Sequence, residues 1–149
     1  MLGGLKKVNP AIDGLNGTET NPDITGEPVH VTSDADYQND LKSDPGHHYP
    51  DVNLQLFNGV EGGPATMQGF VKAYFQETGD VTRSHNIMKY FAPGMLPVLT
   101  TLATRYAVFN RWFSSIPGPT LCNRAFAHFG TSFGNTGMSV NYVGKQDPT

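Results

Sequence analysis

A Pro-Gly-Pro triplet at residues 117–119 separates an apolar run from a segment that can form a helix, and it restricts the possible folds more than any other feature. The run before it, residues 105–113, carries the aromatic and β-branched side chains that favour a strand. The triplet itself forces a tight loop with few backbone hydrogen bonds. Residues 121–129 are compatible with a helix. The sequence therefore predicts a strand, a short loop and a helix in succession.

Thr120, at the mouth of the predicted helix, admits two interpretations. Threonine is a favoured N-cap because its oxygen can accept hydrogen bonds from the first N–H groups of a helix, and on local evidence alone capping is its commoner role. The alternative is an anion site, in which those N–H groups and the positive end of the helix dipole hold a phosphate beside the Thr120 hydroxyl. Asn123, one turn further on, would face the same way.

Residues 108–124, followed by Gly-Thr-Ser at 130–132, resemble the nucleophile segment of the phosphoesterase family that contains bacterial-type phospholipases C and a group of acid phosphatases. The pattern in that family is Gly-Pro-Thr-x-x-Asn-Arg, and the chain carries every fixed position from Gly118 to Arg124. The resemblance implies that Thr120 is the catalytic nucleophile and that Asn123 binds a phosphate oxygen.

A second segment extends the resemblance to residues 44–47, which read Asp-Pro-Gly-His where the family has Asp-Pro-x-His, with Val52 and Gln55 following as expected. Adjacent histidines on an extended chain point in different directions and rarely bind one metal, so His47 and His48 alone would indicate a surface turn. The resemblance implies instead that His47 donates to a phosphate oxygen or to the leaving group, a role suited to a side chain that titrates near neutrality. His48 falls at a position that varies.

Charge and cysteine content exclude several classes of function. The 10 basic and 13 acidic residues give a net charge of -3, which offers no electrostatic footprint for nucleic acid. The single cysteine, Cys122, excludes an intrachain disulfide and is expected to be a small packed residue rather than a nucleophile. No integral membrane segment is expected. The expected partner is a small-molecule or lipid phosphate ester, and only the family resemblance points to secretion.

The remaining sequence predicts a mixture of helices and strands. Residues 6–50 are rich in turn-forming residues and are expected to be loop with one short strand at 28–32. Amphipathic patterns predict helices over 65–78, ended by Gly79, and over 95–106, where the buried face would hold Leu96, Leu99, Leu102 and Ala103. Alternating helices and strands indicate an α/β fold with a parallel sheet and a site at the carboxyl ends of its strands. The resemblance implies an alkaline-phosphatase-like three-layer sandwich, incomplete in this chain.

The resemblance also implies that residues 1–149 are a partial catalytic domain. Residues 1–5 resemble the family sequence directly after a Glu-Asn-Arg-Ser-Phe-Asp-His segment, so the N-terminal metal-site strand and the C-terminal part are expected to be missing. A divalent metal is expected in the full-length protein, with ligands mostly outside this chain. The main hypothesis is a phosphoric-ester hydrolase of the phospholipase C or acid phosphatase type that forms a phosphothreonine intermediate. The alternative is a non-catalytic remnant with at most weak phosphate binding.

Overall fold

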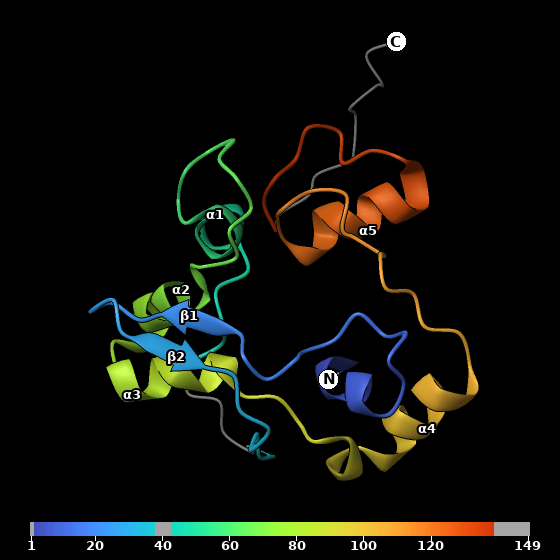
Figure 1. The fold of residues 1–149 in the computed structure, drawn as a ribbon. Coiled ribbons are helices and arrows are strands. Elements are labelled where there is room, and N and C mark those ends of the chain that lie inside the picture. The colour runs from blue at the N-terminus through green and yellow to red at the C-terminus, as the bar shows by residue number, and fades with distance from the viewer. Residues whose placement is uncertain (1, 38–42, 139–149) are drawn as a thin grey trace.

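The computed structural model describes residues 2–37 and 43–138, and their elements form three groups (Figure 1). In chain order, the elements are the 3-10 helix η1 (Leu2–Lys7), the strands β1 (Thr20–Pro22) and β2 (Pro28–His30), the helices α1 (Tyr49–Phe57), α2 (Phe70–Thr78) and α3 (Val81–Ser84), the 3-10 helices η2 (His85–Met88) and η3 (Pro93–Met95), and the helices α4 (Pro97–Arg105) and α5 (Thr120–Phe129). The first group joins both strands to α1, α2, α3 and η2, and the second joins η1 and η3 to α4. The third is α5 with its flanking loops.

The strands β1 and β2 form an antiparallel hairpin in which Thr20 lies opposite His30. The prediction of a strand at residues 28–32 is confirmed for its first three residues, whereas β1 was not predicted. The hairpin is the only sheet within the described parts of the chain. These residues therefore have a mixed α/β structure, but the expected parallel sheet is not found among them.

The turn of the hairpin is organised by Asp23, which is only 4% exposed. Its carboxylate accepts hydrogen bonds from the Thr25 N–H and hydroxyl, both at 2.7 Å, and from the Glu27 N–H at 3.1 Å. The Nε2 atom of His85 lies 3.4 Å from the same carboxylate, so η2 is tied to the turn. Three donors within the hairpin thus satisfy a buried negative group.

Helix α2 forms the centre of the first group and confirms most of the helix predicted over 65–78. Val71, Ala73 and Tyr74 are buried, and Gly79 ends the helix in the left-handed conformation at φ 64°. The prediction is wrong for residues 65–69, because Met67 has φ 59° and its N–H donates to the Leu56 carbonyl at the end of α1. Met67 is therefore 47% exposed and lies outside the core.

A buried asparagine supplies the missing cap of α2, whose N-cap residue Gly69 has no side chain. The Asn21 Oδ1 atom accepts from the Val71 N–H at 3.0 Å, and its Nδ2 atom donates to the Met67 carbonyl at 2.7 Å. Gly69 also lies against α1, since a Cβ atom there would stand 1.7 Å from the Leu54 carbonyl oxygen. Only glycine permits this approach of the two helices.

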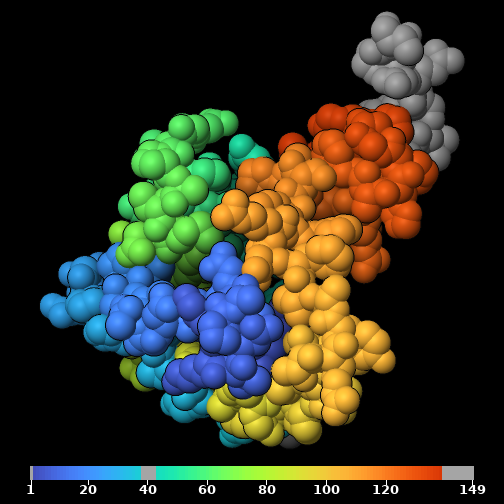
Figure 2. Space-filling view, turned by 45° about the vertical axis from the view of Figure 1, so that its right-hand side comes forward, coloured from blue at the N-terminus to red at the C-terminus, as the bar shows by residue number. Residues whose placement is uncertain are grey.

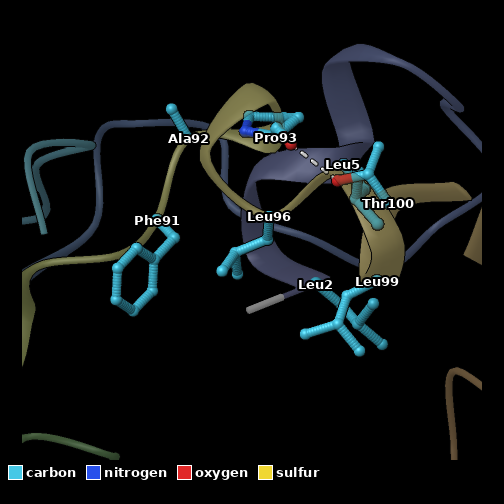
Figure 3. A pocket seen from close by; sticks show the side chains of 8 residues that line it. All are labelled: Leu2, Leu5, Phe91, Ala92, Pro93, Leu96, Leu99 and Thr100. Carbon is cyan, nitrogen blue, oxygen red and sulfur yellow. Dashed lines mark hydrogen bonds between the residues drawn. The ribbon is translucent and has the colours of Figure 1, made fainter. Parts of the chain in front are cut away.

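Helix α4 confirms residues 97–105 of the helix predicted over 95–106, but its predicted buried face is only partly covered. Leu99 and Leu102 are 37% and 48% exposed. The side that does pack lies over η1 and η3, where the Thr100 hydroxyl donates to the Pro93 carbonyl at 2.7 Å and Leu5 is buried beside a small cavity (Figure 3). The apolar face of α4 is therefore larger than the area that η1 and η3 cover, and part of it stays exposed.

The strand predicted at residues 105–113 is also wrong. After α4 the chain runs to the start of α5 as an irregular connection without strand pairing, with a turn at residues 110–111 and bends at 115–118 (Figure 1). Asn110 fixes it to the N-terminal region: its Oδ1 atom accepts from the Asp13 N–H at 2.9 Å, and its Nδ2 atom donates to the Ala11 carbonyl at 2.9 Å. A strand needs a neighbour to pair with, and none lies beside this segment in the described structure.

Candidate functional site

The start of α5 confirms a helix beside Thr120 but corrects its expected role as the cap. Pro119, buried and extended at φ -72° and ψ 169°, is the N-cap, and Thr120 is the first helical residue. The Thr120 side chain is exposed, and its hydroxyl makes no hydrogen bond to any described residue. The capping interpretation therefore fails, because the hydroxyl does not satisfy the end of its own helix.

The first N–H groups of α5 are available to an anion. The N–H groups of Thr120, Leu121 and Cys122 have no acceptor within residues 2–37 and 43–138, and the Asn123 N–H reaches the Pro119 carbonyl only at 3.4 Å. Such groups, together with the positive end of the helix dipole, favour a phosphate. An exposed hydroxyl thus stands where a phosphate would be held.

Asn123 holds the loop that leads to Thr120. Its Oδ1 atom accepts from the Ile116 N–H at 3.1 Å. Its Nδ2 atom lies within hydrogen-bonding distance of three loop carbonyls, those of Gly118 at 3.0 Å, Ile116 at 3.2 Å and Pro119 at 3.3 Å. The structure therefore gives Asn123 a positioning role that the sequence did not predict, while its predicted bond to a phosphate oxygen stays a prediction.

Cys122 packs on the opposite side of the same helix turn, as expected of a small buried residue. It is 0% exposed, and its Sγ atom lies 3.1 Å from the Gly137 carbonyl oxygen. Ala125, one turn along, and Ser132, beyond the helix, are also buried. The face of α5 that carries Cys122 is therefore buried, and the face that carries Thr120 is exposed. Cys122 is thus a packed residue and not an exposed nucleophile.

His47 lies in a loop just before α1, and two side chains anchor this loop. Gln55 Nε2 donates to the Gly46 carbonyl at 2.7 Å, and the Tyr74 hydroxyl donates to the Ser43 carbonyl at 3.2 Å. Gln55, which the resemblance singled out only by its position, therefore holds the loop that carries His47. No pattern in the sequence indicated this bond.

The imidazole of His47 is partly exposed and points along its own loop. Its Nδ1 atom lies 3.3 Å from the Pro45 carbonyl oxygen and 3.5 Å from an Asp44 carboxylate oxygen, and the ring stacks on His48 with 5.0 Å between centroids. The structure brings Thr120 and Asn123 together at one helix end. Within the described ranges, no hydrogen bond, ion pair or ring contact joins His47 to α5.

The described residues do not fit a metal site. None of their His, Cys, Asp and Glu side chains gather in a group of three or more that could hold a metal ion. Three carboxyl groups have a lowered pKa, but each is explained by local bonds: first the Thr25 hydroxyl for Asp23, the Thr32 hydroxyl for Asp34 and the Asn16 N–H for Glu19. These shifts reflect turns and surface pairs rather than a catalytic centre.

Comparison with known proteins extends over the whole chain. The family described as Phosphoesterase matches residues 1–149. Non-specific phospholipase C6 of Arabidopsis thaliana is 41% identical over 138 residues, which cover 91% of this chain and 26% of that protein. Non-specific phospholipase C1 of the same plant is 39% identical over 140 residues, covering 90% and 25%. The chain thus spans about a quarter of the length of these relatives. No helix in its described part combines the length and apolar character needed to cross a membrane.

Proposed function

The chain belongs to the phosphoesterase family, and from this premise we propose that its full-length form hydrolyses phosphoric esters with Thr120 as the nucleophile. One observation carries the proposal. The Thr120 hydroxyl is exposed and has no hydrogen-bonding partner among the described residues, and it lies at a helix start where three backbone N–H groups also have no acceptor among those residues. These groups suit the negative charge that a phosphate brings and that its transfer redistributes.

The proposed reaction has two displacements at phosphorus. In the first, the Thr120 oxygen forms a bond to phosphorus and gives up its proton, while the ester P–O bond breaks and the leaving oxygen takes up a proton. In the second, water attacks the phosphothreonine, the phosphate or phosphorylated head group leaves, and the hydroxyl is restored. By the resemblance, His47 donates to a phosphate oxygen or to the leaving group, and Asn123 binds a phosphate oxygen.

A threonine hydroxyl needs help to attack, because its own pKa is far above neutrality. The described residues offer no metal-binding group beside Thr120. We therefore place the groups that activate the hydroxyl, and any divalent metal, in polypeptide beyond this chain. The same polypeptide would complete the alkaline-phosphatase-like sandwich that the resemblance implies.

The proposed substrate is a phospholipid, because the relatives are named non-specific phospholipases C. An acid phosphatase acting on soluble monoesters is the second candidate within the same chemistry. The two are separated by comparing turnover of phosphatidylcholine vesicles with turnover of p-nitrophenyl phosphate by the full-length protein. A phospholipase C releases diacylglycerol from the vesicles, whereas a phosphatase releases nitrophenol from the monoester.

The nucleophile is tested by Thr120→Val in the full-length protein. We expect the rate to fall by about three powers of ten or more with little change in Tm, because the side chain is exposed and does not cap its helix. Rapid acid quench followed by mass spectrometry should find phosphate on the peptide that contains Thr120. Thr66→Val is the matched control, since Thr66 is also exposed and its hydroxyl has no partner in the described structure. A near wild-type rate in Thr120→Val would sink the nucleophile assignment.

The alternative is a non-catalytic remnant, and the lack of a group of three metal-binding side chains among the described residues favours it. The same assay distinguishes the remnant from the enzyme. A remnant would show no turnover in any longer form of the protein and no phosphothreonine. Turnover that is lost in Thr120→Val and kept in Thr66→Val would exclude it.

A further inference from the structure

An apolar surface extends from α4 along the residues that follow it, and we call it the α4 surface. Its most exposed members are aromatic: Tyr106 is 73%, Phe109 70% and Trp112 80% exposed. With Leu99 and Leu102 they line a hollow of about 460 Å³. Figure 2 shows the yellow-to-orange segment of the α4 surface beside the blue N-terminal residues. A contiguous apolar area of this kind on a protein surface marks an interaction site.

The α4 surface is held in a defined conformation. Asn110 ties its centre to the backbone of Ala11 and Asp13 through two hydrogen bonds of 2.9 Å. Phe109 and Trp112 contact each other edge to face, with 5.6 Å between ring centroids. The aromatic side chains therefore project from an anchored backbone, and they present a surface that a partner can recognise.

We propose that the α4 surface is the docking site for the rest of a phosphoesterase chain, namely polypeptide equivalent to the three quarters of the phospholipase C relatives that this chain does not cover. The first argument is length, because about 90% of this chain matches only about 25% of those relatives. The second is composition, because the side chains that line the hollow are all apolar or aromatic, as in the buried core of an interface between proteins.

The third argument is position, and it rests on the proposed function. Phe113, 78% exposed, continues the α4 surface and stands seven residues before Thr120, at the start of the loop that Asn123 holds. Polypeptide that docks on this surface and follows residues 114–119 would reach the Thr120 hydroxyl. It would be in place to supply the activating groups that the described residues lack.

The test is a chimera in which residues 1–149 replace the matched 138 residues of non-specific phospholipase C6. Hydrogen exchange at residues 99–113 should be about tenfold slower in the chimera than in the chimera carrying Leu102→Glu and Trp112→Glu, because docking would remove these amides from water. The double substitution Leu102→Glu and Trp112→Glu should lower the Tm of the chimera. Val60→Glu is the matched control, since Val60 is 59% exposed and lies outside the α4 surface.

Unchanged exchange at residues 99–113, or a double variant that melts with the control, would overturn the proposal. A double variant that loses binding to phosphatidylcholine vesicles without a change in Tm would assign the surface to lipid, and a dimer that the double variant dissociates would assign it to a second copy. Should the chimera be insoluble, co-expression of the 149-residue chain with the remainder of the relative, followed by co-purification, replaces it, and failure to co-purify counts against docking. Protection without turnover would keep the interface and refute the proposed function.

Discussion

The side-chain amide of Asn123 is almost fully used in hydrogen bonds to the loop before α5. Its amide bonds the backbone of Ile116, Gly118 and Pro119, and this accounts for both Nδ2 hydrogens and one acceptor position of Oδ1. A phosphate oxygen that also takes a hydrogen bond from Nδ2 must share it with a loop carbonyl. Loop geometry and substrate binding are thus coupled through one amide, so a variant of Asn123 alone cannot separate the two roles.

His47 offers a cleaner test because an equivalent side chain stands next to it. In the full-length protein, His47→Ala should lower the rate by about 2–4 powers of ten, the range expected for losing one positioned proton-transfer group. His48→Ala is the control, since it stacks on His47 and falls at the variable position. A loss below threefold in His47→Ala, or equal losses in both, would mean that the assignment of His47 is wrong.

Asp23 makes the hairpin sensitive to acid. The Thr25 hydroxyl, the Thr25 and Glu27 N–H groups and His85 lower the pKa of Asp23 below its ordinary value. A lowered pKa in the folded state means that the stabilisation is present above the ordinary pKa and is lost as the pH falls through the folded pKa. The Tm of the full-length protein should therefore fall as the pH drops below about 4, the ordinary pKa of an aspartate. Asp23→Asn should have a lower Tm at neutral pH and a weaker acid dependence, and equal acid slopes would refute this role.

Gly69 determines how closely α1 and α2 approach. Gly69→Ala would place a Cβ atom 1.7 Å from the Leu54 carbonyl oxygen, so the helices must separate, and we expect a loss of about 2 kcal/mol or more in the free energy of unfolding. Gly94→Ala is the control, because a Cβ atom there meets nothing within 4 Å. Urea unfolding of both variants in the full-length protein measures the difference. Similar losses in both would show that the close approach carries no special cost.

Short-range sequence patterns predicted those helices and strands that depend mainly on contacts between residues near in sequence. The helices α2 and α4 follow from apolar spacing and from glycines such as Gly79, α5 follows from the helix-compatible residues after Thr120, and β2 lies within the strand predicted at 28–32. Helix α1 was missed although Pro50 stands in its first turn and Asp51 accepts from the His48 N–H at 2.9 Å, both common at helix starts. The strand at 105–113 was wrong because strand formation depends on a partner elsewhere in the chain, which side-chain preference does not reveal.

The sequence predicted which residues lie at the candidate site, but it did not predict their hydrogen bonds or the residue that caps α5. The motif correctly placed Thr120 and Asn123 at one helix end. The cap was assigned to the wrong residue because a proline N-cap leaves no side-chain signal, and the loop bonds of Asn123 depend on how residues 116–119 turn back over the helix. The relation of His47 to that end depends on long-range packing, which short motifs do not encode.

The isolated 149-residue chain is expected to fold poorly and to show no metal-dependent phosphatase activity. Its described core contains few large side chains, Leu5, Ile12, Val71 and Tyr74 among them, whereas the whole α4 surface is exposed. Burial of apolar area is the main favourable term in folding, and too little is buried here. Amide proton dispersion, a thermal melt and phosphate release with added divalent metals measure the outcome. A cooperative melt of a monomer, or metal-stimulated turnover lost in Thr120→Val, would contradict the expectation.

The buried position of Cys122 allows local opening of α5 to be measured. As the sole thiol, 0% exposed and set against Gly137, it can react with a thiol-labelling reagent only when α5 lifts away from the residues that follow it. The rate at which Cys122 is modified therefore reports how often α5 opens locally, and no cysteine has to be introduced. A phosphate that binds to the N–H groups of Thr120 and Leu121 should slow the modification of Cys122, so that binding at the exposed side of the helix can be measured at its buried side.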